Sequence, residues 1–119
     1  MTAMESTAPL LIRTYDEINH NRRRLLHEAY HAYPEYIYCE PEEFNWHQSR
    51  GRTNIFDLYY LYDAGYIDLT RGLYEEHRRP DFFMLTPAGA DLMEKPGFLD
   101  EKFPVSAAAL NNRSCHETQ

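Results

Sequence analysis

Leu61-Tyr62-Asp63-Ala64-Gly65-Tyr66-Ile67 is the stretch that decides the fold, because it predicts where a helix ends and a strand begins. Gly65 is placed to take the left-handed position just after a helix. Beyond it, Ile67 and Leu69 alternate with polar neighbours, which predicts a strand from Tyr66 to about Thr70. Before it, we expect a turn at 50–52 and a helix that is capped by Thr53 and runs to about Ala64.

Another stretch, Phe83-Met84-Leu85-Thr86-Pro87-Ala88-Gly89, predicts the opposite junction, from strand to helix. Before that junction we expect a second strand from Asp81 to Thr86, in which Phe83 and Leu85 stand at alternate positions. Thr86 followed by Pro87 is typical of a helix start, and Pro96-Gly97 is expected to end that helix. The two predicted strands therefore form a hairpin, and the ten residues 71–80 make its long, exposed tip.

Upstream, the sequence predicts one long helix and then a connection that fits two alternatives. Thr14 and Glu17 form a capping-box pattern, and Pro34 stops the helix that they begin. Within it, Arg23 and Arg24 are expected to point outward as part of a solvated face. There they could contact a phosphate backbone or pair with Asp16, Glu17 or Glu28. Residues 36–39 fit either a short strand or a linker, and residues 41–46 are expected to form a short helix.

Composition limits the class of protein. A chain of 119 residues fits one domain, and its single Val argues against a β-sandwich or barrel. No apolar run reaches the length of a membrane helix, and two distant Cys residues favour a reducing cytoplasm. We expect a flexible leader over residues 1–13, a folded domain over 14–95, and an extension over 96–119 with apolar anchors and a disordered tail.

The predicted order of elements and the two quoted stretches resemble the winged helix-turn-helix superfamily. The stretch over 61–67 is similar to the common end of a recognition helix, and the stretch over 83–89 is similar to the junction between the second wing strand and the closing helix. The resemblance covers about residues 14–95. It implies an α+β, mainly α fold with a two-stranded wing hairpin. It also implies a small DNA-binding protein that acts as a transcriptional regulator and a homodimer.

DNA binding would place the helix from Thr53 to Ala64 in the major groove of duplex DNA. Residues 50–79 are neutral, whereas the chain as a whole carries −7, so the acidic residues need not face the DNA. From Ile55 to Ala64, however, the helix has no basic residue. The candidate contacts are therefore at the helix start and on the wing: Arg50, Arg52, Thr53, Asn54, Arg71, Arg78 and Arg79.

A winged helix can also serve as a protein-binding module, such as an adaptor, inhibitor or assembly subunit, without binding DNA. The acidic pI near 5.3 favours this alternative. Tyr59 and Tyr60 cannot both point inward together with Leu58 and Leu61, so at least one of them is expected on the surface. The candidate interface residues, which are aromatic as in many protein interfaces, are Tyr59, Tyr60, Phe98 and Phe103.

One short pattern points to catalysis. His27-Glu28-Ala29-Tyr30-His31 matches H-E-x-x-H, in which two His one helical turn apart bind zinc. A zinc site needs a third ligand, and neither Glu40, Glu42, Glu43 nor His47 completes a known signature. We interpret the match as fortuitous and expect no enzyme activity, no cofactor and no metal, with His27 and His31 as the only metal candidates.

Overall fold

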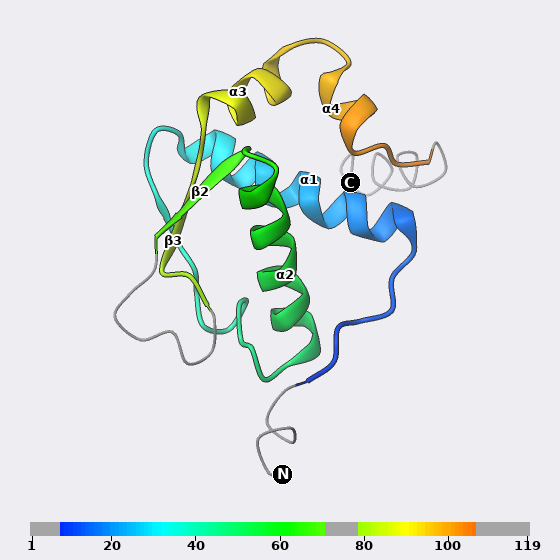
Figure 1. The fold of residues 1–119 in the computed structure, drawn as a ribbon, viewed down its shortest axis with the longest axis vertical. Coiled ribbons are helices and arrows are strands. Elements are labelled where there is room, and N and C mark those ends of the chain that lie inside the picture. The colour runs from blue at the N-terminus through cyan, green and yellow to red at the C-terminus, as the bar shows by residue number, and fades with distance from the viewer. Residues whose placement is uncertain (1–7, 71–78, 107–119) are drawn as a thin grey trace, which may run out of the picture.

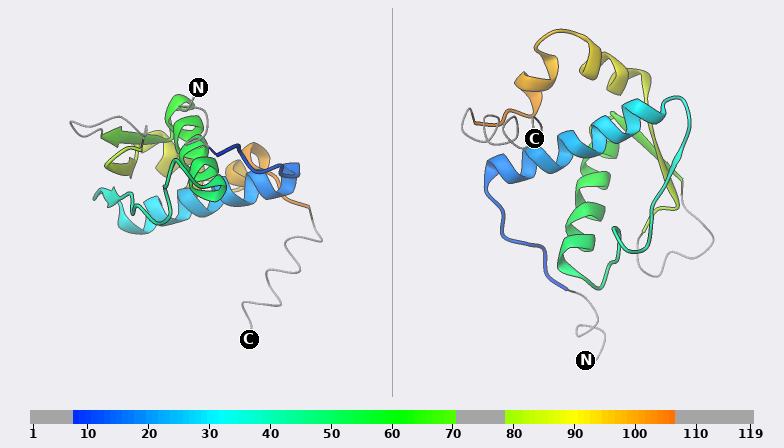
Figure 2. Two further views of the ribbon diagram at one scale, coloured as in Figure 1. Left: turned by 90° about the horizontal axis from the view of Figure 1, so that it is seen from below. Right: turned by 180° about the vertical axis from the view of Figure 1, so that it is seen from behind.

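The computed structural model describes residues 8–70 and 79–106, and within them the fold is α+β and mainly helical (Figure 1). The described residues form four helices and one three-stranded antiparallel sheet. In chain order the elements are α1 (Tyr15–Ala32), β1 (Ile37–Tyr38), α2 (Ser49–Asp63), β2 (Ile67–Thr70), β3 (Phe82–Leu85), α3 (Pro87–Glu94) and α4 (Phe98–Lys102). In Figure 1, α2 lies in front of α1, and the view from behind in Figure 2 shows α1 nearest the viewer.

The long first helix begins and ends as the sequence predicts. The Thr14 hydroxyl accepts a hydrogen bond from the Glu17 N–H at 3.1 Å, and the Thr14 N–H donates to the Glu17 carboxylate at 2.8 Å. These two bonds complete the expected capping box and satisfy amides that the helix start leaves free. The helix ends at Ala32, shortly before Pro34.

The start of α2 differs from the prediction. The helix begins at Ser49 rather than after Thr53, so residues 50–52 are helical and not a turn. Gly51 makes this possible, because it packs directly on the backbone of Asn45, where a Cβ would collide with the Asn45 amide and carbonyl. Gln48 precedes the helix without a side-chain cap, and Thr53 lies one turn inside it.

The short helix expected over residues 41–46 is also wrong. The chain makes only a single turn there, in which the Glu40 carbonyl accepts hydrogen bonds from the N–H groups of Glu43 and Phe44. Phe44 nevertheless anchors this connection in the core, with 1% of its surface exposed. A single buried aromatic ring therefore holds this connection without a helix around it.

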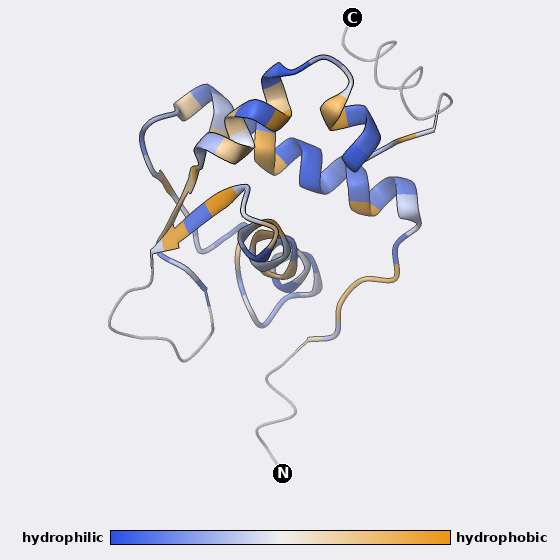
Figure 3. Ribbon diagram, turned by 45° about the horizontal axis from the view of Figure 1, so that its top comes forward, coloured by the Kyte–Doolittle hydropathy of each residue, from blue (hydrophilic) through white to orange (hydrophobic). Residues whose placement is uncertain are grey.

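The hairpin is confirmed, and residues 37–38 add a third strand to it. The strand order is β1-β3-β2, with both pairs antiparallel. Phe83 lies opposite Ile37 on one side and Leu69 on the other, so these three face the core. Figure 3 shows the resulting alternation of hydrophobic and hydrophilic residues along β2. The predicted hairpin tip falls mostly on residues 71–78, which lie outside the described part of the chain.

The two stretches that predicted the fold meet in space. Gly65 has a φ of 91° and ends α2, while the N–H of Tyr66 donates to the Leu61 carbonyl. The Thr86 hydroxyl then links the two junctions, because it donates to the Gly65 carbonyl at 2.6 Å and accepts from the Gly89 N–H at 3.0 Å. This one side chain both closes the hairpin and caps α3.

Both ends of the described chain pack onto the domain. Within the segment expected as a loose leader, the Leu11 N–H donates to the Thr53 hydroxyl at 3.1 Å, so residues 8–13 run beside α2 to the start of α1. After α3, the chain forms the additional helix α4, which the sequence did not predict, and Phe103 enters the core with 2% exposure. Residues 107–119 of the expected tail lie outside the described part. No helix of the described segments has both the length and the apolar character needed to cross a membrane.

We predict that Gly89→Ala lowers the free energy of unfolding by about 1–3 kcal/mol, because a Cβ there meets the Tyr66 carbonyl and lies 2.7 Å from a Leu85 methyl group. Urea unfolding followed by circular dichroism measures this change. The matched control is Ala88→Ser, an exposed neighbour on the same helix, which should change stability by less than about 0.5 kcal/mol. Equal midpoints for the two variants would contradict this explanation of the packing.

Candidate functional site

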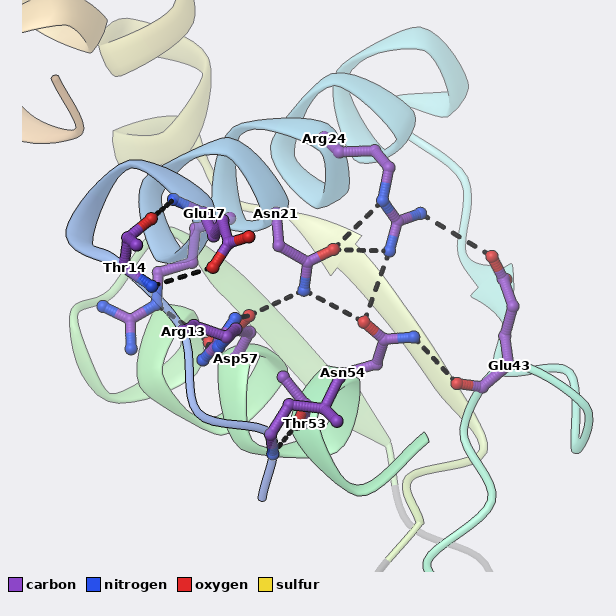
Figure 4. A network of polar contacts seen from close by, with 11 residues as sticks. Arg13, Thr14, Glu17, Asn21, Arg24, Glu43, Thr53, Asn54 and Asp57 are labelled. Atoms are coloured by element: carbon purple, nitrogen blue, oxygen red, sulfur yellow. Dashed lines mark hydrogen bonds and ion pairs between the residues drawn. The ribbon is translucent and has the colours of Figure 1, made fainter. Parts of the chain in front are cut away.

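A buried carboxylate lies at the centre of the contact between α1 and α2 (Figure 4). Asp57, in the middle of α2, has none of its surface exposed. Arg13 donates to both of its oxygens, at 2.7 and 3.1 Å. The Arg22 Nε donates at 3.0 Å and the Asn21 amide at 2.6 Å. Asp57 is therefore fully paired, as a buried charge must be, and it ties α2 to α1 and to the segment before α1.

Two of the predicted DNA contacts belong to this buried cluster. The Asn54 amide donates to the Glu43 carbonyl at 2.9 Å, and its oxygen accepts from Asn21 at 2.9 Å. The Thr53 hydroxyl accepts from the Leu11 N–H. Both residues are 3% exposed, so they hold the fold together and do not face a partner.

The two arginines at the start of α2 have different surroundings. Arg50 is exposed. Arg52 is half-buried, and its guanidinium carbon lies 4.0 Å from the centre of the Trp46 ring. Its Nη1 is buried and makes no hydrogen bond to any described residue. Only Arg50 of this pair is thus presented openly to solvent.

On the wing, one of the three predicted arginines can be placed. The Arg79 guanidinium donates to the Cys39 carbonyl at 2.8 Å and to the Tyr38 hydroxyl at 3.5 Å. It therefore joins the base of the hairpin to β1. Arg71 and Arg78 lie outside the described residues.

The basic run in α1 is largely internal. Arg22 and Arg23 are each 9% exposed, so the expectation that Arg23 points outward is wrong. Arg23 donates to the Phe103 carbonyl at 2.9 Å and pairs with Asp100 at 3.0 Å, because the C-terminal segment folds back over it. Arg24 pairs with Glu28 at 2.7 Å, as the sequence indicated.

The side of α2 that faces away from the core carries aromatic rings. Phe56 is 47% exposed and Tyr60 is 44% exposed, and Tyr59 between them is half-buried. The exposed Asp63 ends the same stripe and Arg52 begins it. We call this surface the α2 outer face; its residues are Arg52, Phe56, Tyr59, Tyr60 and Asp63, which span an arc of about 100° on a helix.

The other predicted interface residues divide between surface and interior. Tyr60 is held in place by Arg22, whose guanidinium carbon lies 3.6 Å from the ring centre, and by Phe103 at a ring separation of 6.3 Å. Phe103 is buried and so serves the core. Phe98 on α4 is 45% exposed, at the opposite end of the domain from the start of α2.

The two histidines of the H-E-x-x-H match lie on the surface of α1. His27 and His31 are both exposed, with ring centres 6.4 Å apart. Among residues 8–70 and 79–106, no three His, Cys, Asp or Glu side chains gather in a way that could hold a metal ion. The structure therefore brings no third ligand to this pair from the described residues.

A groove of about 580 Å³ runs between the segment before α1, α1 itself and the start of α2. Three arginines line it, namely Arg13, Arg24 and Arg50. Arg13 is paired with Asp57, and Arg24 is paired with Glu28 and lies 3.6 Å from Glu43. Most of the positive charge in the groove is thus neutralised within the chain.

Comparison of the chain with protein-family profiles, curated proteins and solved structures gave no match. The site is accordingly interpreted from its own chemistry. That chemistry separates α2 into a buried polar side, which fixes the helix, and an exposed aromatic side.

Sequence reasoning missed Asp57 and Phe56. Asp57 counted only as an acid on a helix that should be basic. The available signal was its spacing of four residues from Leu61, which puts both side chains on the same, inward side of α2. Phe56 was not singled out because an isolated Phe in a helix usually signals core. Its position opposite Leu58 on a helical wheel was the available signal.

We predict that Asp57→Ala destabilises the chain by about 3–5 kcal/mol, because it leaves two buried guanidinium groups without their carboxylate. Chemical denaturation gives the value. Asp68→Ala, which removes an exposed carboxylate on β2, should change stability by about 0.5 kcal/mol or less. A similar small loss for both variants would show that the buried cluster does not hold α2.

Cys39 should be inert in the folded chain. Burial raises the pKa of its thiol to about 12, partly opposed by the Arg79 guanidinium, and a protonated thiol is a poor nucleophile. In a Cys115→Ser variant we expect a disulfide reagent to label Cys39 rapidly only after unfolding in urea. Rapid labelling of the folded chain at pH 8 would contradict the buried position.

The same shift predicts a pH dependence of stability. The folded pKa of about 12 lies above the ordinary value of 9.0, so the unfolded chain loses this proton first. Stability should therefore fall as the pH rises above about 9, and this part of the fall should be absent in Cys39→Ala, which has no thiol to ionise. Urea unfolding of the two chains at a series of pH values measures the difference.

Proposed function

We propose that the chain is a winged-helix module that acts by binding protein, and that the α2 outer face is its docking surface. The winged-helix assignment is supported by the helix, hairpin and helix order, and by the way the two quoted stretches meet through Thr86. In that assignment α2 is the helix that would enter DNA and the β2–β3 hairpin is the wing. We also propose the reducing cytoplasm as its compartment, in keeping with the free, buried thiol of Cys39.

The exposed aromatic side of α2 is the observation that carries this proposal. A helix that reads DNA presents Arg, Lys, Asn or Gln along its exposed side. Here the exposed side presents Phe56, Tyr59 and Tyr60, while Asn54 is bonded inside the domain. Aromatic residues in such a cluster are typical of protein interfaces, and burying one fully exposed ring is worth roughly 1.5–3 kcal/mol.

Charge supports the same conclusion. Binding to DNA depends on cations that neutralise phosphates. The chain carries −7, and of the seven residues predicted to contact DNA, Thr53, Asn54 and Arg79 already bond within the domain. Arg50 alone among the described ones is exposed. Two cations at the start of α2, the exposed Arg50 and the half-buried Arg52, give little attraction for a duplex.

Fluorescence anisotropy with a random-sequence duplex, at low and moderate salt, tests DNA binding, the alternative function. We expect no binding even at low salt, where contacts to phosphate are strongest. Binding that weakens steeply with salt and is lost in Arg50→Ala would instead establish DNA binding and would overturn the proposal.

Photocrosslinking tests the docking surface directly. A benzoylphenylalanine probe at position 56 should form crosslinks to protein in cells of the source organism. The matched control carries the probe at position 82, because Phe82 is similarly exposed, at 39%, but lies on the sheet. Crosslinks at position 82 and none at position 56 would exclude the α2 outer face.

A further inference from the structure

We propose that the partner of the α2 outer face is a second copy of this chain, bound with the two α2 helices antiparallel across a two-fold axis. This inference rests on the proposed function and specifies its partner. It comes from the order of charges and rings along the face, which is self-complementary.

The α2 outer face has opposite charges at its two ends. Arg52 lies near the start of the stripe and Asp63 at its end, which are about 16 Å apart along the helix axis. Phe56 and Tyr59 lie between them. Along its middle, the face therefore carries a cation, two rings and an anion in order. The third ring, Tyr60, lies at the edge of the face, against Arg22 and Phe103.

A two-fold interface requires a surface that complements itself, since each contact occurs twice with the roles exchanged. Arg52 and Asp63 lie equally far from the midpoint between positions 57 and 58, and so do Phe56 and Tyr59. If the axis passes through that midpoint, Arg52 faces the partner's Asp63, and Phe56 faces the partner's Tyr59. A parallel arrangement would instead place Arg52 against the partner's Arg52.

The rest of the structure favours this arrangement. Arg52 is already held against Trp46, so pairing costs it little further loss of side-chain freedom. Antiparallel helices also place the negative end of one helix dipole beside the positive end of the other. In Figure 1, α2 lies in front of α1 and below α3 and α4, and no other described element crosses its near side.

The helix dipole makes Asp63→Arg a suitable test variant, because it should not reduce the stability of α2. Asp63 ends α2, where a negative side chain opposes the helix dipole and a positive one is favourable. Asp63→Arg should therefore fold at least as well as the natural chain. It should nevertheless break the dimer, because it places a second cation opposite each Arg52.

Analytical ultracentrifugation of the full chain over about a hundredfold range of concentration tests the proposal. We expect a species of twice the 14.1 kDa chain mass that dissociates on dilution. Asp63→Arg should raise the dimer dissociation constant at least about tenfold, and Phe56→Asp should leave a monomer. The Arg52→Asp/Asp63→Arg double variant restores the paired charges and should recover the dimer to within about threefold of the natural chain.

Glu101→Arg is the matched control, because it makes the same change of charge on α4 and should leave the dimer intact. Circular dichroism confirms that each variant is folded. A dimer that survives both Phe56→Asp and Asp63→Arg would overturn the proposal, and so would a double variant that stays monomeric.

A natural chain that is monomeric at every concentration would also overturn it. If the probe at position 56 then still crosslinks a different protein, the proposed function stands and only the identity of the partner is wrong. If that probe crosslinks nothing, both proposals fall.

Discussion

The buried carboxylate of Asp57 is the constraint on which the arrangement of this domain depends. It receives hydrogen bonds from three residues on two other segments, and both arginines among them need it as a counter-charge. Because Asp57 must point inward, the rotation of α2 about its own axis is fixed. Phe56 and Tyr60 are then turned to the outside, although burial in the core would suit both rings.

The inward position of Asp57 also explains why residues at the start of α2 have the side chains of DNA contacts but stabilise the fold. Thr53 and Asn54 have the side chains that a DNA-reading helix would use, but they lie on the side of Asp57 and join its cluster. Their polar groups bind the neighbouring segments. What remains outside is an aromatic stripe with one charge at each end, which is the surface that we propose for binding.

The secondary structure could be predicted from sequence wherever local chemistry decides it. The capping box at Thr14, the left-handed Gly65 and the Thr86-Pro87 helix start each determine their own junction. The start of α2 could not be predicted, because it depends on Gly51 packing against Asn45 through a turn that has no local signature. The burial of Arg23 was likewise hidden, since it requires Phe103, some eighty positions later, to fold back over α1.

The most direct test of the central claim is a map of backbone amide shifts in a ¹⁵N-labelled chain as unlabelled chain is added. Shifts confined to α2, centred on the turn that holds Phe56 and Tyr59, are the predicted result, with the buried cluster unchanged. Shifts centred on β1, α3 or α4 would contradict the claim that the α2 outer face binds a second copy. The claim would also be contradicted if adding unlabelled chain caused no shifts while adding duplex DNA caused shifts around Arg50.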